Sequence, residues 1–145
     1  MKIYFAASIR GGRDDAGFYA EMINLLKPYG TVLTEHFGDI TIKSSTGTGN
    51  DVGLIYQQDL AWIKEADVIV AEVSTPSLGV GIEIGVASYS LKKPVLCLYR
   101  PQTGTRLSAM IAGCPNVTNT TYSKVEDLPN LFGLFFDKLK SKQLF

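Results

Sequence analysis

The residue whose type and setting most suggest chemistry is Glu83, a carboxylate just inside a predicted helix. It follows an apolar strand pattern, 68–72, and a turn of small residues, 74–79. Strand, small-residue turn and helix is how an α/β protein presents backbone N–H groups to an anion. One interpretation gives Glu83 no function: an acidic residue in the first turns of a helix is favoured by the helix dipole. Helical stepping instead places Glu83 on one face with four apolar residues, Val80, Val86, Ala87 and Leu91.

Asp59 is a second carboxylate on an apolar helical face. By helical stepping it falls at the centre of a stripe formed by Val52, Ile55, Trp62, Ile63 and Ala66. An ionised carboxylate facing a core is costly unless it is paired or hydrogen-bonded. Helical spacing alone does not decide between two roles for Asp59: a functional carboxylate, or a structural one that is hydrogen-bonded to the backbone of a loop. Two carboxylates in one site with separated pKa values are, however, what glycosidic cleavage uses, one as nucleophile and the other as proton donor.

Further polar residues fall in the loops that would surround these two carboxylates. Tyr4 lies mid-strand, where it is either a core residue or a phenol that reaches the active carboxylate. The loop 7–13 offers backbone donors, a hydroxyl and a guanidinium, which together predict a phosphate cradle; a plain turn is the alternative. His36 is a candidate ligand contact or a solvated loop histidine. The candidates in these loops are Ser8, Ile9, Arg10, Gly11, His36, Ser77, Gly79 and Ser108.

Composition narrows the class of protein. The 145 residues predict one domain, 1–145, and the 14 basic residues balance the 14 acidic ones, which argues against a nucleic-acid polymer as partner. No apolar run approaches the ~20 residues of a membrane span. The two cysteines lack CxxC spacing, and therefore favour reduced thiols and a cytoplasmic location, with the nucleus as a second compartment. A single histidine excludes a His-rich metal site.

The elements that must position these residues alternate along the chain. Five strands alternating with helices predict a single-domain, doubly wound α/β fold with a parallel five-stranded sheet. Its ligand is expected at the carboxyl ends of the strands, with the first strand central. The predicted strands are 2–6, 31–34, 68–72, 95–99 and 117–122, and the predicted helices are 18–26, 51–66, 80–91, 107–112 and 127–144.

Several blocks of the chain, from the first strand to about Gly113, resemble the 2′-deoxynucleoside 5′-phosphate N-hydrolases of the nucleoside 2-deoxyribosyltransferase superfamily. Ile82 stands where that family is expected to carry a tyrosine, and the loop 38–50 matches poorly. The blocks are Ile3-Tyr4-Phe5, Ser8 to Arg13, Val32 to His36, Gln58 to Trp62, Ala66 to Val73, Pro76 to Glu83, Leu96 to Leu98, Arg100 to Gln102 and Leu107 to Ile111.

The resemblance implies a flavodoxin-like (Rossmann-like) fold and a role for each matched residue. Glu83 would be the nucleophile that forms a 5-phospho-2-deoxyribosyl ester, Asp59 the proton donor to the leaving base, and Tyr4 the residue that positions the carboxylate. The products would be a free base and 2-deoxyribose 5-phosphate, with a small-molecule nucleotide as substrate and no metal or cofactor. In a homodimer, Ser108 would reach the neighbouring site. The 5′-phosphate would be held by Ser8, Ile9, Arg10, Ser77, Gly79 and the partner's Ser108.

Three alternatives stay open. A nucleoside deoxyribosyltransferase would use the same carboxylates but would act on unphosphorylated nucleosides, against which the cradle argues. A ribonucleotide hydrolase of the CMP type would keep both cradle and nucleophile. The third alternative is a nucleotide-binding module without catalysis, and it is distinguished from the enzymes by whether the protein turns over a substrate in a reaction that needs Glu83. A dinucleotide site is excluded because the segment 8–13 has no GxGxxG.

Overall fold

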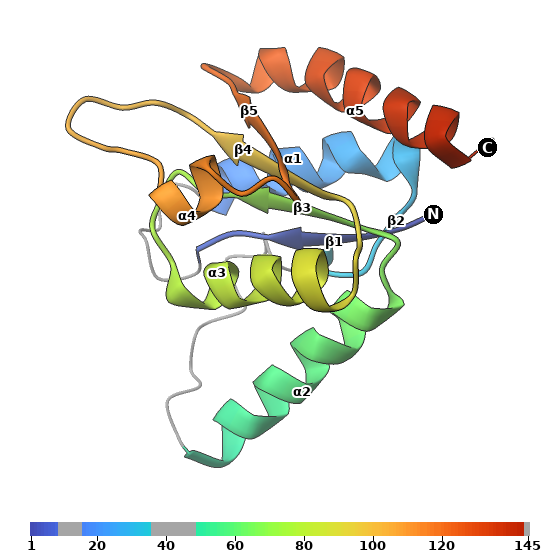
Figure 1. Ribbon diagram of the computed structural model, residues 1–145, viewed down its shortest axis with the longest axis vertical. Helices are drawn as coiled ribbons and strands as arrows, with labels where there is room; N and C mark the ends of the chain where they lie inside the picture. Colours follow the sequence, from blue (N-terminus) through green and yellow to red (C-terminus); the bar gives the residue numbers. More distant parts are fainter. Residues whose placement is uncertain (9–15, 36–48, 144–145) are drawn as a thin grey trace.

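The computed structural model describes residues 1–8, 16–35 and 49–143. Five parallel strands form one sheet in the order β2-β1-β3-β4-β5, with helices on both faces (Figure 1). The predicted α/β class and parallel sheet are therefore confirmed, and this strand order is that of a flavodoxin-like fold. The strands are β1 (Lys2–Ala6), β2 (Thr31–Val32), β3 (Val68–Glu72), β4 (Val95–Tyr99) and β5 (Thr118–Thr121).

The helices follow the predicted order with shifted ends. Segment 86–90 continues α3 as a π-helical turn, and 3₁₀ turns at 27–29 and 125–127 follow α1 and precede α5. Ser77 and Ser108 cap α3 and α4, which explains why these two helices begin where they do. The helices are α1 (Ala16–Leu26), α2 (Gly49–Glu65), α3 (Leu78–Gly85), α4 (Ala109–Ala112) and α5 (Leu128–Gln143).

Strand β2 is shorter than the predicted 31–34. Leu33 still donates its backbone N–H to the Ile3 carbonyl at 2.8 Å. At Thr34, however, the side chain replaces the ladder, because its hydroxyl oxygen accepts from the Phe5 N–H at 2.9 Å and donates to the Phe5 carbonyl at 2.8 Å. β1 therefore lies inside the sheet between β2 and β3, while β3, and not β1, is the middle strand.

Alternation along the strands divides the core into two layers. Helices α1 and α5 cover one face of the sheet, and α2 and α3 cover the other (Figure 1). Along β1, Ile3 and Phe5 face α1 and α5, whereas Tyr4 and Ala6 face α2 and α3. Tyr4 is thus placed on the same side of the sheet as the two helices that carry Asp59 and Glu83.

Candidate active site

The site lies on the α2/α3 face of the sheet and is built from three elements. β1 contributes Tyr4, which is 3% exposed, α2 contributes Asp59, and α3 contributes Glu83. The two carboxylates are half-buried. The side chains interact, since Tyr4 hydrogen-bonds Glu83, and the charge of Asp59 acts on both. The structure thus brings together the three residues predicted to be catalytic.

The electrostatics of this cluster make Glu83 an unusual glutamate. Burial, reinforced by the negative charge of Asp59, raises the pKa of Glu83 from 4.5 to about 7, although the hydrogen bond from Tyr4 opposes the shift. Burial also raises the pKa of Asp59. The pKa of the Tyr4 phenol is raised by burial and by the two carboxylates, so it is a hydrogen-bond donor and not a base. The pKa values of both carboxylates are thus raised, and carboxylates with perturbed pKa values are typical of sites of acid–base chemistry.

Helix α2 presents Asp59 differently from the predicted continuous core stripe. Its second half is buried at Ile63 and Ala66, but Val52 and Ile55 in its first half are 55% and 41% exposed. In Figure 1 the first half of α2 extends beyond the sheet and α3. The prediction that this whole stripe faces the core is therefore wrong, because helical periodicity defines a face but not whether a neighbour covers all of it. Asp59 lies where the buried half begins.

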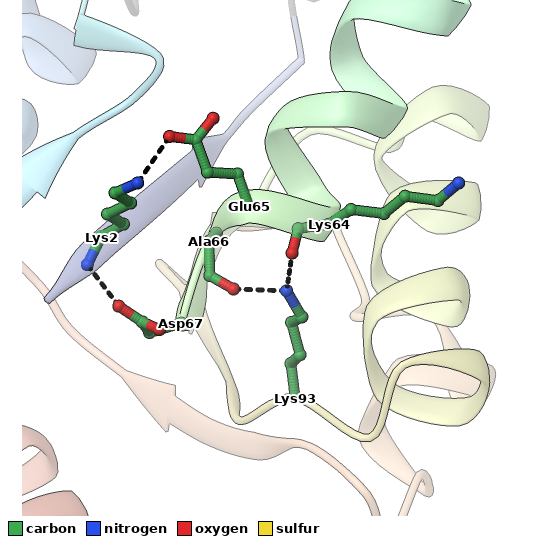
Figure 2. A network of polar contacts seen from close by, with 6 residues as sticks. All are labelled: Lys2, Lys64, Glu65, Ala66, Asp67 and Lys93. Atoms are coloured by element: carbon green, nitrogen blue, oxygen red, sulfur yellow. Dashed lines mark hydrogen bonds and ion pairs between the residues drawn. The ribbon is translucent and has the colours of Figure 1, made fainter.

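The carboxyl end of α2 is held by a polar clamp (Figure 2). The Lys93 ammonium donates to the carbonyl oxygens of Lys64 and Ala66, as Figure 2 shows, and also to that of Ile63 at 2.9 Å. A cation at this position satisfies carbonyls that the helix leaves unpaired and complements its dipole. On the other side of the junction the Lys2 backbone N–H donates to Asp67 at 2.7 Å. The buried half of α2, and hence Asp59, is anchored to the sheet through this clamp.

The turn after β3 has the features of an anion site. Ser77 caps α3, its hydroxyl oxygen accepting from the Val80 N–H at 3.3 Å. The first intrahelical bond runs from the Gly81 N–H to the Ser77 carbonyl, which leaves the N–H groups of Leu78 and Gly79 without an acceptor in the helix. Among the described residues, a Cβ on Gly79 would meet only the Ser77 hydroxyl, at 3.9 Å, so no described residue crowds this backbone.

The remaining residues predicted to contact the substrate differ in burial and in their position relative to Glu83. Ser8, after β1, is buried at 5% exposure, whereas Ser108 is exposed and accepts from the Met110 N–H at 3.2 Å as the cap of α4. Ser77 and Gly79 lie within two turns of Glu83 on the same helix, and Ser108 belongs to a different loop. Ile9, Arg10, Gly11 and His36 lie outside the described residues.

One buried carboxylate was not singled out in the sequence. Glu72 ends β3 and is 3% exposed, with hydrogen bonds from Ser74 and Tyr122. The sequence did contain a signal for this residue, namely an acidic side chain within the apolar run VIVAE. Because a middle strand of a parallel sheet is covered on both faces, such a side chain is expected to be buried.

Other classes of site find no support in the described ranges. Within 1–8, 16–35 and 49–143, no group of three or more His, Cys, Asp and Glu side chains is arranged to hold a metal ion. No helix in these ranges is long and apolar enough to cross a membrane. Both cysteines are free thiols, with Cys97 buried in β4.

Comparison with known proteins finds relatives over most of the chain. A relative from Nematostella vectensis, whose name places it provisionally among the 2′-deoxynucleoside 5′-phosphate N-hydrolases, is 50% identical over 141 residues, covering 95% of each chain. The Mus musculus 5-hydroxymethyl-dUMP N-hydrolase is 51% identical over 113 residues, which are 77% of this chain and 64% of that protein. A Clostridium botulinum CMP N-glycosidase has the same fold, with a TM-score of 0.63, 21% identity and coverage of 93% and 99% of the two chains.

The match to a family model is equally extensive. The model described as nucleoside 2-deoxyribosyltransferase covers residues 3–130, which include Tyr4, Asp59 and Glu83. The chain therefore belongs to the nucleoside 2-deoxyribosyltransferase family.

Proposed function

We propose that this protein hydrolyses the N-glycosidic bond of 2′-deoxynucleoside 5′-monophosphates, releasing the free base and 2-deoxyribose 5-phosphate. The observation that carries the proposal is Glu83, whose pKa is raised to about 7 beside Asp59 and Tyr4, within two helical turns of the turn at Ser77 and Gly79 that has the features of an anion site. The names of the relatives, which are N-hydrolases of deoxynucleoside monophosphates, support the same substrate class.

In the proposed mechanism, an oxygen of ionised Glu83 attacks C1′ while the bond from C1′ to the base nitrogen breaks. The electron pair of that bond leaves with the base, and protonated Asp59 supplies the proton that neutralises it. Water then attacks C1′ of the glycosyl ester, gives a proton to Asp59 and releases Glu83. Burial raises the pKa of Asp59 and so favours its protonated form before the first step. Once Asp59 is protonated, its negative charge no longer opposes ionisation of Glu83, and the Tyr4 hydrogen bond favours the ionised form of Glu83 against the effect of burial.

We propose that the 5′-phosphate binds at the start of α3. There the N–H groups of Leu78 and Gly79, which have no acceptor within the helix, and the positive end of the helix dipole favour an anion. The hydroxyl of Ser77 is in the same turn. Ser8, Ile9, Arg10 and Gly11 are proposed to complete the cradle from the loop after β1, and His36 to contact the substrate.

The protein is proposed to act as a homodimer. Apolar side chains that a monomer would leave in water gather on α2, α3 and the start of α4, with Leu78 92% and Met110 83% exposed. A second copy is the occupant that would cover this surface and would bring its exposed Ser108 to a neighbouring phosphate. The large exposed side chains on these elements are Val52, Leu54, Ile55, Tyr56, Leu78, Ile82 and Met110.

Mixed variants test the dimer. Ser108→Ala chains lack the donated hydroxyl, and Glu83→Gln chains lack the nucleophile, so a mixture contains some sites with both intact. We expect the mixture to regain about a quarter of wild-type activity at most, and Met110→Glu to shift the sedimenting species to a monomer. A mixture no more active than its two components together would remove Ser108 from the shared site.

Product analysis by chromatography tests the reaction. The protein is incubated with deoxynucleoside 5′-monophosphates, including one with 5-hydroxymethyluracil, with matching ribonucleotides and with unphosphorylated deoxynucleosides. Free base from the deoxymonophosphates alone supports the proposal, whereas base from CMP would favour a ribonucleotide hydrolase. A new nucleoside formed only when a second base is present would indicate a transferase. Binding without turnover would leave a nucleotide-binding module and refute the role of Glu83.

A further inference from the structure

Glu72 is a buried ionisable group that the proposed reaction does not use. It is the last residue of β3, the middle strand, and only 3% of it is exposed. A carboxylate at such a position destabilises the fold unless it is hydrogen-bonded from several sides. The presence of this carboxylate at the start of the loop that leads to Ser77 and Gly79 therefore requires a physical explanation.

Three donors from two segments surround the Glu72 carboxylate. The Ser74 backbone N–H donates to Oε1 at 2.6 Å, the Ser74 hydroxyl donates to Oε2 at 3.0 Å, and the Tyr122 hydroxyl also donates to Oε2. Burial raises the pKa of Glu72, but these hydrogen bonds and the nearby charge of Arg100 oppose that rise. Because every named partner is a donor or a cation, the arrangement suits an ionised carboxylate.

Ser74 is the point at which two loops of the sheet edge meet. While its hydroxyl donates to Glu72, the same oxygen accepts from the Arg100 backbone N–H at 2.8 Å, at the start of the loop after β4. One residue earlier, the Val73 N–H donates to the Leu98 carbonyl at 2.9 Å. The β3–α3 loop is thus tied to β4 on one side and, through Tyr122, to the segment after β5.

Only Thr75 and Pro76 separate this junction from Ser77. Pro76 has a fixed φ, which limits how far the short connection can move. The position of the α3 cap, and of the N–H groups after it that have no acceptor within the helix, is consequently set by where Ser74 is held.

We infer that Glu72 is a positioning residue: through Ser74, its buried carboxylate holds the β3–α3 loop in the conformation that binds the 5′-phosphate of the substrate. This inference rests on the proposed function, because it assumes that the phosphate binds at the start of α3. The other loop tied to Ser74 runs on to Ser108, so the same junction links the two loops that carry phosphate-binding serines.

The test compares phosphorylated with unphosphorylated ligands. Ser74→Ala removes the hydroxyl that donates to Glu72 and accepts from the Arg100 N–H but keeps the backbone N–H donor, and Ser74→Thr keeps the hydroxyl. We expect Ser74→Ala to raise KM and Kd for a deoxynucleoside 5′-monophosphate about tenfold, as loss of one or two hydrogen bonds predicts, with kcat changed less than threefold. The Kd for the matching deoxynucleoside should change less than twofold, and Ser74→Thr should restore most of the affinity. Tyr122→Phe and Glu72→Gln should shift the same ratio in the same direction.

Ser88→Ala is the matched control, because Ser88 is also a buried serine and its hydroxyl donates to the Ile84 carbonyl at 2.7 Å. It should lower Tm but leave the ratio of the two affinities unchanged. Equal weakening of both ligands by Ser74→Ala, or a lower Tm with unchanged phosphate affinity, would overturn the inference. The affinity ratio requires binding only, so a wild-type protein that binds monophosphates without hydrolysing them would refute the proposed function and still test Glu72.

Discussion

Replacing Glu83 by glutamine should stabilise the protein above neutral pH while abolishing turnover. The carboxylate has an ordinary pKa of 4.5 and a folded-state pKa of about 7. The folded protein therefore binds more protons than the unfolded chain between these two values. Since stability falls with pH wherever the folded state binds more protons, Glu83 lowers the free energy of unfolding as pH rises from about 4.5 to about 7. Glutamine has nearly the same shape and no charge.

The magnitude follows from the shift. At ~1.4 kcal/mol per pKa unit, the change from 4.5 to about 7 corresponds to at most about 3.5 kcal/mol. Because Glu83 is only half-buried, solvent screening reduces this to about 1–2 kcal/mol, which is a gain in Tm of roughly 5 °C for a chain of this size.

Urea unfolding of wild type and Glu83→Gln at several values from pH 4 to 8 measures the difference. We expect no difference near pH 4, a growing gain in the variant from about pH 4.5 to 7, and a plateau above that. Glu21→Gln, at an exposed position of α1, is the control and should stay within ~0.5 kcal/mol of wild type at every pH. A gain that is independent of pH, or a loss at pH 8, would refute the reasoning that burial and Asp59 disfavour the charge of Glu83.

Three further perturbations address the groups around this carboxylate. Tyr4→Phe removes a hydrogen bond to the Glu83 carboxylate and should raise its pKa by about 1–2 units, measured by ¹³C NMR titration without substrate; an unchanged or lower pKa would contradict the geometry. Asp59→Asn should lower the Glu83 pKa in the same titration and lower kcat by about 10²–10⁴, and a kcat within threefold of wild type would remove Asp59 as proton donor. Lys93→Met leaves three carbonyl oxygens at the end of α2 without their cation and should cost about 2 kcal/mol in urea unfolding and lower kcat/KM; unchanged stability would show that the clamp does not anchor α2.

The fold was largely predictable because its signals are local. Short apolar runs such as 68–72 and 95–99, separated by helical periodicity, predict parallel strands with crossovers, and both strands have the predicted bounds. Topology then brings the carboxyl ends of such strands to one edge, which is why residues as distant in sequence as Tyr4 and Glu83 could be assigned to one site. The roles of the predicted site residues remain proposals.

Tertiary structure alone decided how the apolar faces are covered. The stripe on α2 is uniform in sequence, yet Ile63 is buried and Val52 is 55% exposed, because only the second half of the helix has the sheet and α3 beside it. The raised pKa of Glu83 likewise depends on its distance from Asp59 and on how much water reaches it, and neither quantity is encoded in helical spacing.

The hydrogen bonds around Glu72 likewise depend partly on local sequence and partly on tertiary structure. The sequence by itself established the strand VIVAE and the serine two residues later. Tyr122, however, is fifty residues away and comes within reach of Glu72 because β4 pairs with β3 and β5 pairs with β4 in the sheet. Local periodicity determines which face of an element a side chain occupies. Which distant groups share that space depends on how the elements pack, and that packing places the hydrogen-bond donors around a buried carboxylate.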